Sequence, residues 1–163
     1  MFAPDLTGKA VQILPSTASK GVVVFFVLAG CPNAQAYVPE MNRIANLYGP
    51  KGWKFYLAYA DTFFNRHDLA KSAKQYGYTF PVVLGHGKLV ARAQATKSPE
   101  AAVFSPSGNL LYHGRIDDRF YALGKYRLEA KTHDLRNTLV AIEAGKPAPH
   151  ASTEVVGCFL PHD

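Results

Sequence analysis

The chain has few cysteines, few charged residues and no long apolar runs. Two cysteines among 163 residues are too few for a disulfide scaffold and, without clustered histidines, too few for a zinc site. The longest apolar run, residues 22–29, is far shorter than the ~20 residues that cross a bilayer. We therefore expect no membrane partner and no bound metal, and any cysteine chemistry should be thiol chemistry.

Internal repeats and low-complexity segments are also absent. With 48% hydrophobic and 18% charged residues, the chain is too apolar and too weakly charged to be disordered, and its length fits one domain. The first nine residues lack the basic and apolar regions of a signal peptide. The protein is thus either cytosolic or exported with its signal removed.

The net charge of +6 raises the question of nucleic acid binding. Residues 43–97 carry nine basic and two acidic side chains, but no two basic residues are adjacent and no aromatic-basic motif for single strands is present. This distribution indicates a solvated basic flank, and no nucleic acid partner is expected.

Hydrophobic periodicity predicts alternating strands and helices. Continuous or alternating apolar runs predict strands at residues 11–14, 21–28, 53–60, 80–84, 101–104 and 110–113, the last two forming a hairpin. Spacing of three to four, with capping residues, predicts helices at 32–48, 65–76, 89–95 and 133–144. Pro39 lies inside the first helix and should kink it or break its hydrogen bonding locally.

This order predicts an α/β fold with a central mixed β-sheet and helices on both of its faces. We expect one domain over residues 1–145, followed by a C-terminal tail over 146–163 that carries Cys158. The tail contains several prolines, but residues 155–160 are too apolar for a purely solvated end.

Cys31 follows a buried strand and starts a helix, with Pro32 at the first helical position. Free N–H groups and the helix dipole at such a position stabilise a thiolate, which is the reactive form of cysteine. The alternative is a small buried cysteine that only packs beneath the sheet. We favour the reactive interpretation.

Several motifs together resemble the thioredoxin fold and, more narrowly, the alkyl hydroperoxide reductase/thiol-specific antioxidant redoxins. They are Cys31-Pro32-Asn33-Ala34 after a buried strand, Pro39, Phe80-Pro81-Val82, Ser98-Pro99-Glu100, His113-Gly114-Arg115-Ile116-Asp117-Asp118, and the tail sequence Val156-Gly157-Cys158. The resemblance implies a redox protein that needs no cofactor.

The resemblance also implies roles for individual residues. Pro99 matches the family's cis-proline, which faces the nucleophilic sulfur, and Ser98 before it would offer backbone hydrogen bonds to a substrate strand. The candidate substrate-binding residues are therefore Pro32, Ser98, Pro99 and His113. His113 could act as a base or a lone ligand near Cys31, although a half-buried strand histidine is the more ordinary interpretation.

The chain departs from the family pattern at two positions. Ala34 replaces the second cysteine of the thioredoxin motif, so no disulfide forms within that loop. Leu28 stands where a peroxiredoxin would carry a hydroxyl that orients the peroxide. Arg115 could supply the cation that a peroxidase places near its sulfur, or it could pair with Asp117 or Asp118.

Cys158 is the internal candidate for a resolving cysteine. The segment from Gly145 to Cys158 reaches ~43 Å when extended, which exceeds the ~15 Å radius of gyration of such a domain. Cys158 could instead pack the tail onto the core or bridge to a second subunit. The sequence leaves the oligomeric state open.

The catalytic set expected from the sequence is Cys31, Cys158 and Arg115. Cys31 would attack a disulfide or a hydroperoxide, with Cys158 or an external thiol completing the cycle. The partners would be an external thiol reductant or a disulfide-containing protein, and a redox-active pair favours an exported location over the cytoplasm. The alternative is a non-catalytic thioredoxin-like module that binds a protein or a copper ion at the Cys31 face.

Overall fold

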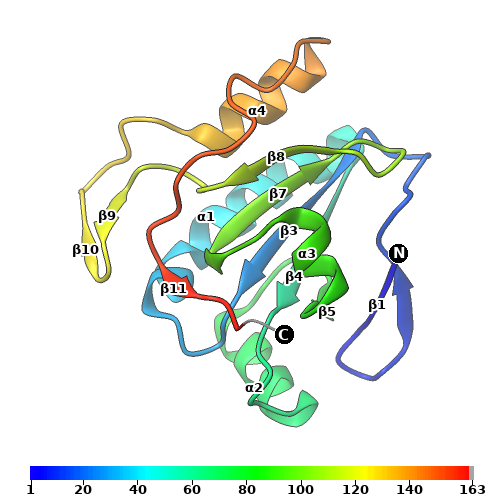
Figure 1. Cartoon of the computed structure of the whole chain (residues 1–163), viewed down its shortest axis with the longest axis vertical. Coiled ribbons are helices and arrows are strands. Elements are labelled where there is room, and N and C mark those ends of the chain that lie inside the picture. The colour runs from blue at the N-terminus through cyan, green and yellow to red at the C-terminus, as the bar shows by residue number, and fades with distance from the viewer. Residues whose placement is uncertain (162–163) are drawn as a thin grey trace.

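The computed structural model describes residues 1–161 as a central sheet with helices packed on it (Figure 1). The strands are β1 (Phe2–Pro4), β2 (Ala10–Gln12), β3 (Gly21–Val27), β4 (Trp53–Tyr59), β5 (Val82–Leu84), β6 (Lys97–Ser98), β7 (Glu100–Phe104), β8 (Leu110–Gly114), β9 (Phe120–Ala122), β10 (Lys125–Tyr126) and β11 (Cys158–Phe159). The helices are α1 (Pro32–Tyr48), α2 (Arg66–Tyr76), α3 (Lys88–Ala93) and α4 (Asp134–Glu143), with a 3-10 turn at Gly49–Lys51.

The main sheet has five strands in the order β5-β4-β3-β7-β8. β3 pairs in parallel with β4, and β4 with β5, whereas β7 runs antiparallel to both β3 and β8. The parallel half arises from strand-helix-strand crossovers, and the antiparallel half from the hairpin. The expected mixed sheet of an α/β fold is therefore confirmed.

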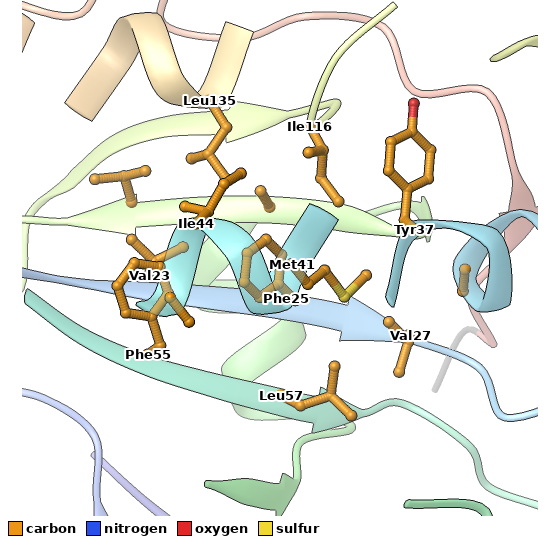
Figure 2. Packing of buried hydrophobic residues seen from close by; sticks show 14 of the residues in the cluster. Val23, Phe25, Val27, Tyr37, Met41, Ile44, Phe55, Leu57, Ile116 and Leu135 are labelled. Atoms are coloured by element: carbon orange, nitrogen blue, oxygen red, sulfur yellow. The ribbon is translucent and has the colours of Figure 1, made fainter. Parts of the chain in front are cut away.

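The central strand β3 is buried along its whole length, which explains why its sequence is continuously apolar. Val23, Phe25 and Val27 point into the larger core, where Figure 2 shows them beside side chains such as Met41 and Ile44 of α1. The alternate residues of β3 point to the opposite face and join a second core there.

Different elements cover the two faces of the sheet. The larger core contains buried side chains of α1, α2 and α4, while the second contains Leu89 and Ala93 of α3 together with Ala3 of β1. Both faces are thus covered, as expected. Within residues 1–161, none of the helices has the length and apolar character to span a membrane.

Local capping signals act as expected. The Asn65 side chain accepts a hydrogen bond from the Asp68 N–H at 2.9 Å, and Gly77 ends α2 with a φ of 67°. α1 is assigned as one helix through Pro39, so no break in the helix occurs there. Because proline has no N–H, residue 39 itself donates no hydrogen bond within the helix.

The segment after α4 folds back across the molecule (Figure 1). The backbone N–H of His113 donates to the Ala151 carbonyl at 3.1 Å, which places this part of the tail beside β8. Further along, β11 pairs antiparallel with β6. The apolar tail residues Val155 and Leu160 are 5% and 3% exposed, which explains why their sequence is unlike that of a solvated end.

Candidate functional site

Cys31 lies at the N-cap of α1, immediately after the turn that follows β3. Its backbone carbonyl accepts the first helical hydrogen bond, from the Gln35 N–H at 3.0 Å, and Pro32 occupies the first helical position, where its side chain is exposed. The Cys31 side chain is only 2% exposed. The thiol therefore lies at the positive end of the α1 dipole but beneath other atoms.

The turn before Cys31 is held by side chains from distant segments. The Ala29 N–H donates to the Asp61 carboxylate at 3.1 and 3.3 Å, and the Leu28 N–H donates to the Ser98 Oγ at 2.9 Å. Burial raises the pKa of Asp61 above its ordinary value, although the bond from Ala29 acts in the opposite direction. These bonds fix the backbone that presents the Cys31 sulfur.

The loop facing Cys31 consists of β6 and the following proline. The Ser98–Pro99 peptide bond is cis, Ser98 is fully buried, and its carbonyl oxygen accepts a hydrogen bond from the Cys31 Sγ at 3.3 Å. The structure therefore brings Cys31, Ser98 and Pro99 together.

The C-terminal strand β11 lies against this same loop. In the antiparallel pair of β11 with β6, Cys158 is opposite Ser98 and Phe159 is opposite Lys97. The Cys158 side chain packs against the core cluster that contains Cys31, and the Cys31 side chain acts on its ionisation, so the two thiols are neighbours. Both cysteines are free thiols in the structure.

The surroundings of Cys158, including the Cys31 thiol, change its ionisation. Burial raises the pKa of Cys158 to about 12, and the hydrogen bond and charge of Cys31 act in the same direction. Reduced Cys158 is therefore a protonated thiol at neutral pH.

Three hydrogen bonds anchor the tail on either side of Cys158. Lys97 Nζ donates to the Val155 carbonyl at 3.0 Å, Asn33 Nδ2 donates to the Val156 carbonyl at 3.1 Å, and the Leu160 N–H donates to the Thr96 carbonyl at 2.9 Å. Together with the burial of Leu160, these contacts fix the register of β11.

A glycine makes the close approach of the tail possible. A Cβ atom built at Gly157 would overlap the carbonyl oxygen of Ser98, so no other residue type fits there without moving the strand. The Gly-Cys pair noted in the sequence thus has a steric reason.

His113 does not lie at the thiol as a free base. Its Nδ1 is 3.0 Å from the Glu100 Oε2, and Glu100 also accepts hydrogen bonds from the Thr96 and Lys97 N–H groups through its other oxygen. The half-buried strand histidine is therefore the arrangement found. Through Glu100, which is 1% exposed, His113 supports the loop that carries Ser98.

Sequence reasoning named Ser98 and Pro99 but missed Glu100. Its position directly after Pro99, as a carboxylate within an otherwise apolar strand, was the available signal.

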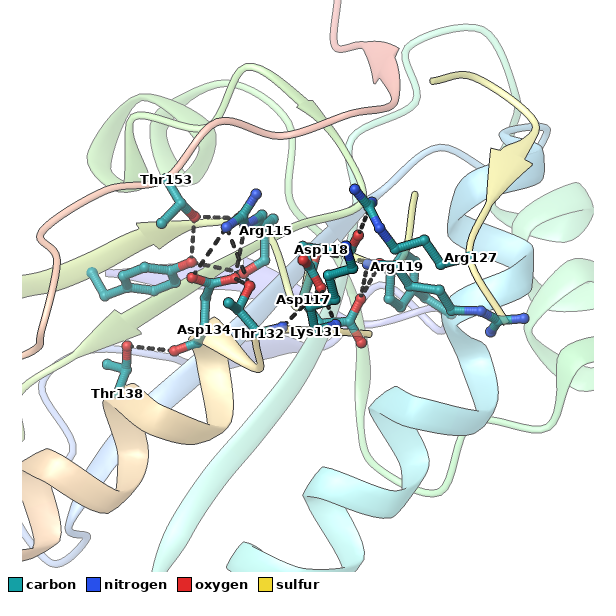
Figure 3. A network of polar contacts seen from close by, with 12 residues as sticks. Arg115, Asp117, Asp118, Arg119, Arg127, Lys131, Thr132, Asp134, Thr138 and Thr153 are labelled. Carbon is teal, nitrogen blue, oxygen red and sulfur yellow. Dashed lines mark hydrogen bonds and ion pairs between the residues drawn. The ribbon is translucent and has the colours of Figure 1, made fainter. Parts of the chain in front are cut away.

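Arg115 was expected to act as a cation near the sulfur, or alternatively to pair with Asp117 or Asp118, but its ion pair is with Asp134 (Figure 3). Its Nε lies 2.7 Å from the Asp134 Oδ2, at the start of α4. Asp117 accepts a bond from the Arg119 N–H at 2.9 Å, and Asp118 accepts bonds from backbone N–H groups of the loop before α4. Arg115 thus joins the end of β8 to α4, and within residues 1–161 no hydrogen bond or ion pair connects it to either cysteine.

A group of possible metal ligands lies apart from the cysteines. Donor atoms of Glu40, Asp117 and His133 lie within 4.8 Å of one another, a grouping that local sequence spacing did not reveal because the residues come from three separate segments. The Glu40 Oε1 already forms ion pairs with the Arg136 Nη2 at 2.6 Å and with the Arg43 Nε at 3.4 Å. These two guanidinium groups oppose a second cation at the same carboxylate.

Comparison with known proteins gives the family. The model of the AhpC/TSA family matches residues 2–113, which include Cys31, Ser98 and Pro99 but not the tail. The chain belongs to the AhpC/TSA family. This redoxin matches no curated protein sequence.

Solved structures share its thioredoxin-like fold. An uncharacterized conserved protein from Geobacillus kaustophilus has a TM-score of 0.84 at 22% identity, covering 100% of this chain and 88% of that one. A hypothetical protein from Sinorhizobium meliloti has a TM-score of 0.81 at 22% identity, covering 98% and 89%.

A third structure, titled a putative thiol:disulfide interchange protein DsbE from Chlorobium tepidum, has a TM-score of 0.58 at 22% identity, covering 69% of the redoxin and 78% of that chain. At these identities the structural likeness shows the fold, and family membership supports a redox role for the redoxin.

Proposed function

We propose that the redoxin catalyses thiol-disulfide exchange through a reversible disulfide between Cys31 and Cys158. The observation that carries this proposal is the register of β11 on β6, which sets Cys158 opposite the serine whose carbonyl accepts the Cys31 thiol hydrogen. The proposal is also supported by the influence of the Cys31 side chain on the ionisation of Cys158, since such an influence requires neighbouring thiols.

In the reaction, the two thiols give up two electrons and two protons to an external disulfide. The external disulfide is released as two thiols, and a bond forms between the Cys31 and Cys158 sulfurs. The substrates are disulfide- or thiol-bearing proteins, and the return step uses an external thiol reductant. No cofactor enters this scheme.

Peroxide reduction is the weaker candidate for the same site. Leu28 has no side-chain hydroxyl to orient a peroxide, and its backbone N–H and carbonyl are already hydrogen-bonded to the Ser98 Oγ and the Cys31 N–H. We therefore propose disulfide exchange in preference to peroxide reduction.

The proposal is tested by oxidising the reduced protein with glutathione disulfide and mapping the peptides without reduction. Wild type should yield a linked Cys31–Cys158 peptide and free glutathione, whereas Cys31→Ser and Cys158→Ser should each stop at a glutathione adduct. Separate adducts on both cysteines of wild type, with no link between them, would overturn the proposal. Stoichiometric Cu(I) uptake by a wild type that forms no disulfide would favour a binding module.

A further inference from the structure

The hairpin formed by β9 and β10 exposes apolar side chains to solvent. The hairpin segment, residues 119–128, carries four of the large hydrophobic side chains that are exposed within residues 1–161: Tyr121, Leu123, Tyr126 and Leu128. Leu128 is 94% exposed. Apolar side chains gathered on one surface in this way mark a contact surface for a partner.

The same segment is basic. Its charged residues are Arg119, Lys125 and Arg127, and it holds no acidic residue. Within residues 1–161, none of these three cations forms an ion pair. Lys125 is exposed, directly after the turn of the hairpin at Gly124. The positive charge of the segment is therefore available to a partner.

One buried side chain ties the hairpin to the cysteine site. Asn33, two residues after Cys31, is fully buried, and its Oδ1 accepts a hydrogen bond from the Gly124 N–H at 3.1 Å. The Asn33 Nδ2 donates to the Val156 carbonyl, also at 3.1 Å. The turn of the hairpin and the tail that leads into β11 thus meet at one residue, and Figure 1 shows β9 and β10 beside β11.

We propose that the hairpin segment is the docking surface for a disulfide-bearing partner protein whose chain is acidic and apolar around its reacting cysteine. This inference rests on the proposed thiol-disulfide exchange and names its substrate class. Carboxylates of the partner pair with the hairpin cations, and its apolar side chains cover Tyr121, Leu123 and Leu128. Opposite charge speeds the encounter, and apolar contact prolongs it. The family model ends at residue 113, so this surface lies outside the part of the chain that it matches.

A second exposed ring with a cation lies on the tail. Phe159 follows Cys158 and is 72% exposed, and the Lys97 Nζ lies 5.1 Å from the centre of its ring. Exposed rings and cations therefore occur on both of the segments that meet at Asn33. A partner that binds the hairpin finds the same chemistry beside the cysteines.

A protein fits this surface better than a single-stranded nucleic acid does. Bases bind by stacking on open aromatic faces. Here Arg119 lies 5.1 Å from the Tyr126 ring centre, and Arg127 lies 5.4 Å from that of Tyr121, so one face of each ring is already covered. The adjoining cysteines also exchange with thiols and disulfides, which proteins carry and nucleic acids lack.

Binding of two dye-labelled peptides to the reduced full-length protein tests the surface. One peptide has aspartate, glutamate and leucine on both sides of a central serine, which replaces cysteine so that no exchange occurs. The other has lysine and arginine in place of the acidic residues. Fluorescence anisotropy should show the acidic peptide bound at least about tenfold more tightly at low salt, and this preference should disappear near ~1 M salt, where screening acts within ~3 Å. Equal affinities, or a preference for the basic peptide, would overturn the inference.

Substitutions at exposed positions locate the binding. Lys125→Glu should weaken binding of the acidic peptide by about fivefold or more. Lys146→Glu is the matched control, because it makes the same charge change at an exposed lysine beyond α4, which Figure 1 shows away from the hairpin. Leu128→Ser should weaken binding by about fivefold through lost apolar contact. An equal loss in Lys146→Glu, or no loss in Lys125→Glu and Leu128→Ser, would contradict the assignment.

Other ligands are compared in the same assay. Tighter binding of labelled oligothymidylate, or of phosphatidylserine vesicles, than of the acidic peptide would assign the surface to nucleic acid or lipid and overturn the inference.

Exchange is measured separately, with cysteine restored in both peptides and each peptide joined to glutathione. The acidic disulfide should oxidise wild type faster than the basic one at low salt. A Cys31–Cys158 link that forms at equal rates with both would overturn the inference alone. Absence of the link with both disulfides would instead refute the proposed function, so the two failures are distinguishable.

Discussion

Cys158 lies directly opposite Ser98 in the antiparallel pair of β11 and β6. Because the Ser98 carbonyl also accepts the hydrogen bond from the Cys31 thiol, one buried residue determines the relative position of both cysteines. The 126 residues between the cysteines in the sequence make this proximity a property of the fold.

Oxidation should stabilise the protein. A Cys31–Cys158 disulfide would close a long loop and restrict the unfolded chain, which typically contributes about 2–4 kcal/mol. Urea unfolding of oxidised and reduced wild type should show this difference in free energy of unfolding. Cys158→Ser should unfold at the same urea concentration with or without oxidant, and coincident curves for the two forms of wild type would contradict the prediction.

The stability of the reduced protein should fall at alkaline pH because of Cys158. Its pKa is raised in the folded state to about 12, so the stabilising effect is fully present below the ordinary thiol value and is lost as pH rises toward 12. We would measure the free energy of unfolding of reduced wild type and of Cys158→Ser from about pH 8 to about pH 11, the range in which an unfolded thiol ionises. Subtracting one from the other removes the contributions of lysine and tyrosine, which are common to both proteins. As pH rises, the free energy of unfolding of wild type should fall relative to that of Cys158→Ser. A difference between the two proteins that stays constant with pH would refute the prediction.

Arg115→Met should affect stability and leave cysteine reactivity unchanged. The ion pair with Asp134 is partly exposed, so its loss should cost no more than about 1 kcal/mol. Disulfide formation between Cys31 and Cys158 should proceed at the wild-type rate. A marked slowing in Arg115→Met, at a pH where both proteins remain folded, would restore the catalytic role that the sequence suggested.

Asp61 should stabilise the turn before Cys31 by accepting the hydrogen bond from the Ala29 N–H. Asp61→Ala removes the partner of the Ala29 N–H and should cost roughly 1–3 kcal/mol, because that donor is then left without a partner. Asp61→Asn keeps an acceptor and removes a partly buried charge, so it should be near neutral or stabilising at pH 7. Chemical unfolding of both variants checks the order, and an Asn variant less stable than the Ala variant would contradict it.

Much of the fold follows from local patterns in the sequence. The continuous apolar run of β3 reflects burial on both faces, and Asn65 and Gly77 mark the ends of α2 through side-chain capping and a positive φ. The motif around Cys31 predicted a helix N-terminus beside a buried strand, and α1 begins there. Such features depend on neighbouring residues and are therefore readable from the chain itself.

Side-chain partners were less predictable. The sequence offered Arg115 two roles, a cation near the Cys31 sulfur or a partner of Asp117 or Asp118. It pairs instead with Asp134, because α4 packs against the end of β8. Glu100 was not singled out, although it holds the Ser98 loop and pairs with His113. Both arrangements depend on how separate elements pack, which local spacing does not encode.

By itself, the sequence determined an α/β redoxin with one cysteine at a helix start and a second in an apolar tail. Only the tertiary structure decided that the tail docks on β6, that Cys158 meets Cys31, and that the helix cysteine is the more buried of the two. The physical reason is that propensity, capping and hydrophobic period act over a few residues. The docking of β11 instead depends on contacts with segments far away in the chain. Gly157 has no side chain and can therefore lie against the Ser98 carbonyl, the Leu160 side chain is buried, and the Leu160 N–H is hydrogen-bonded to Thr96.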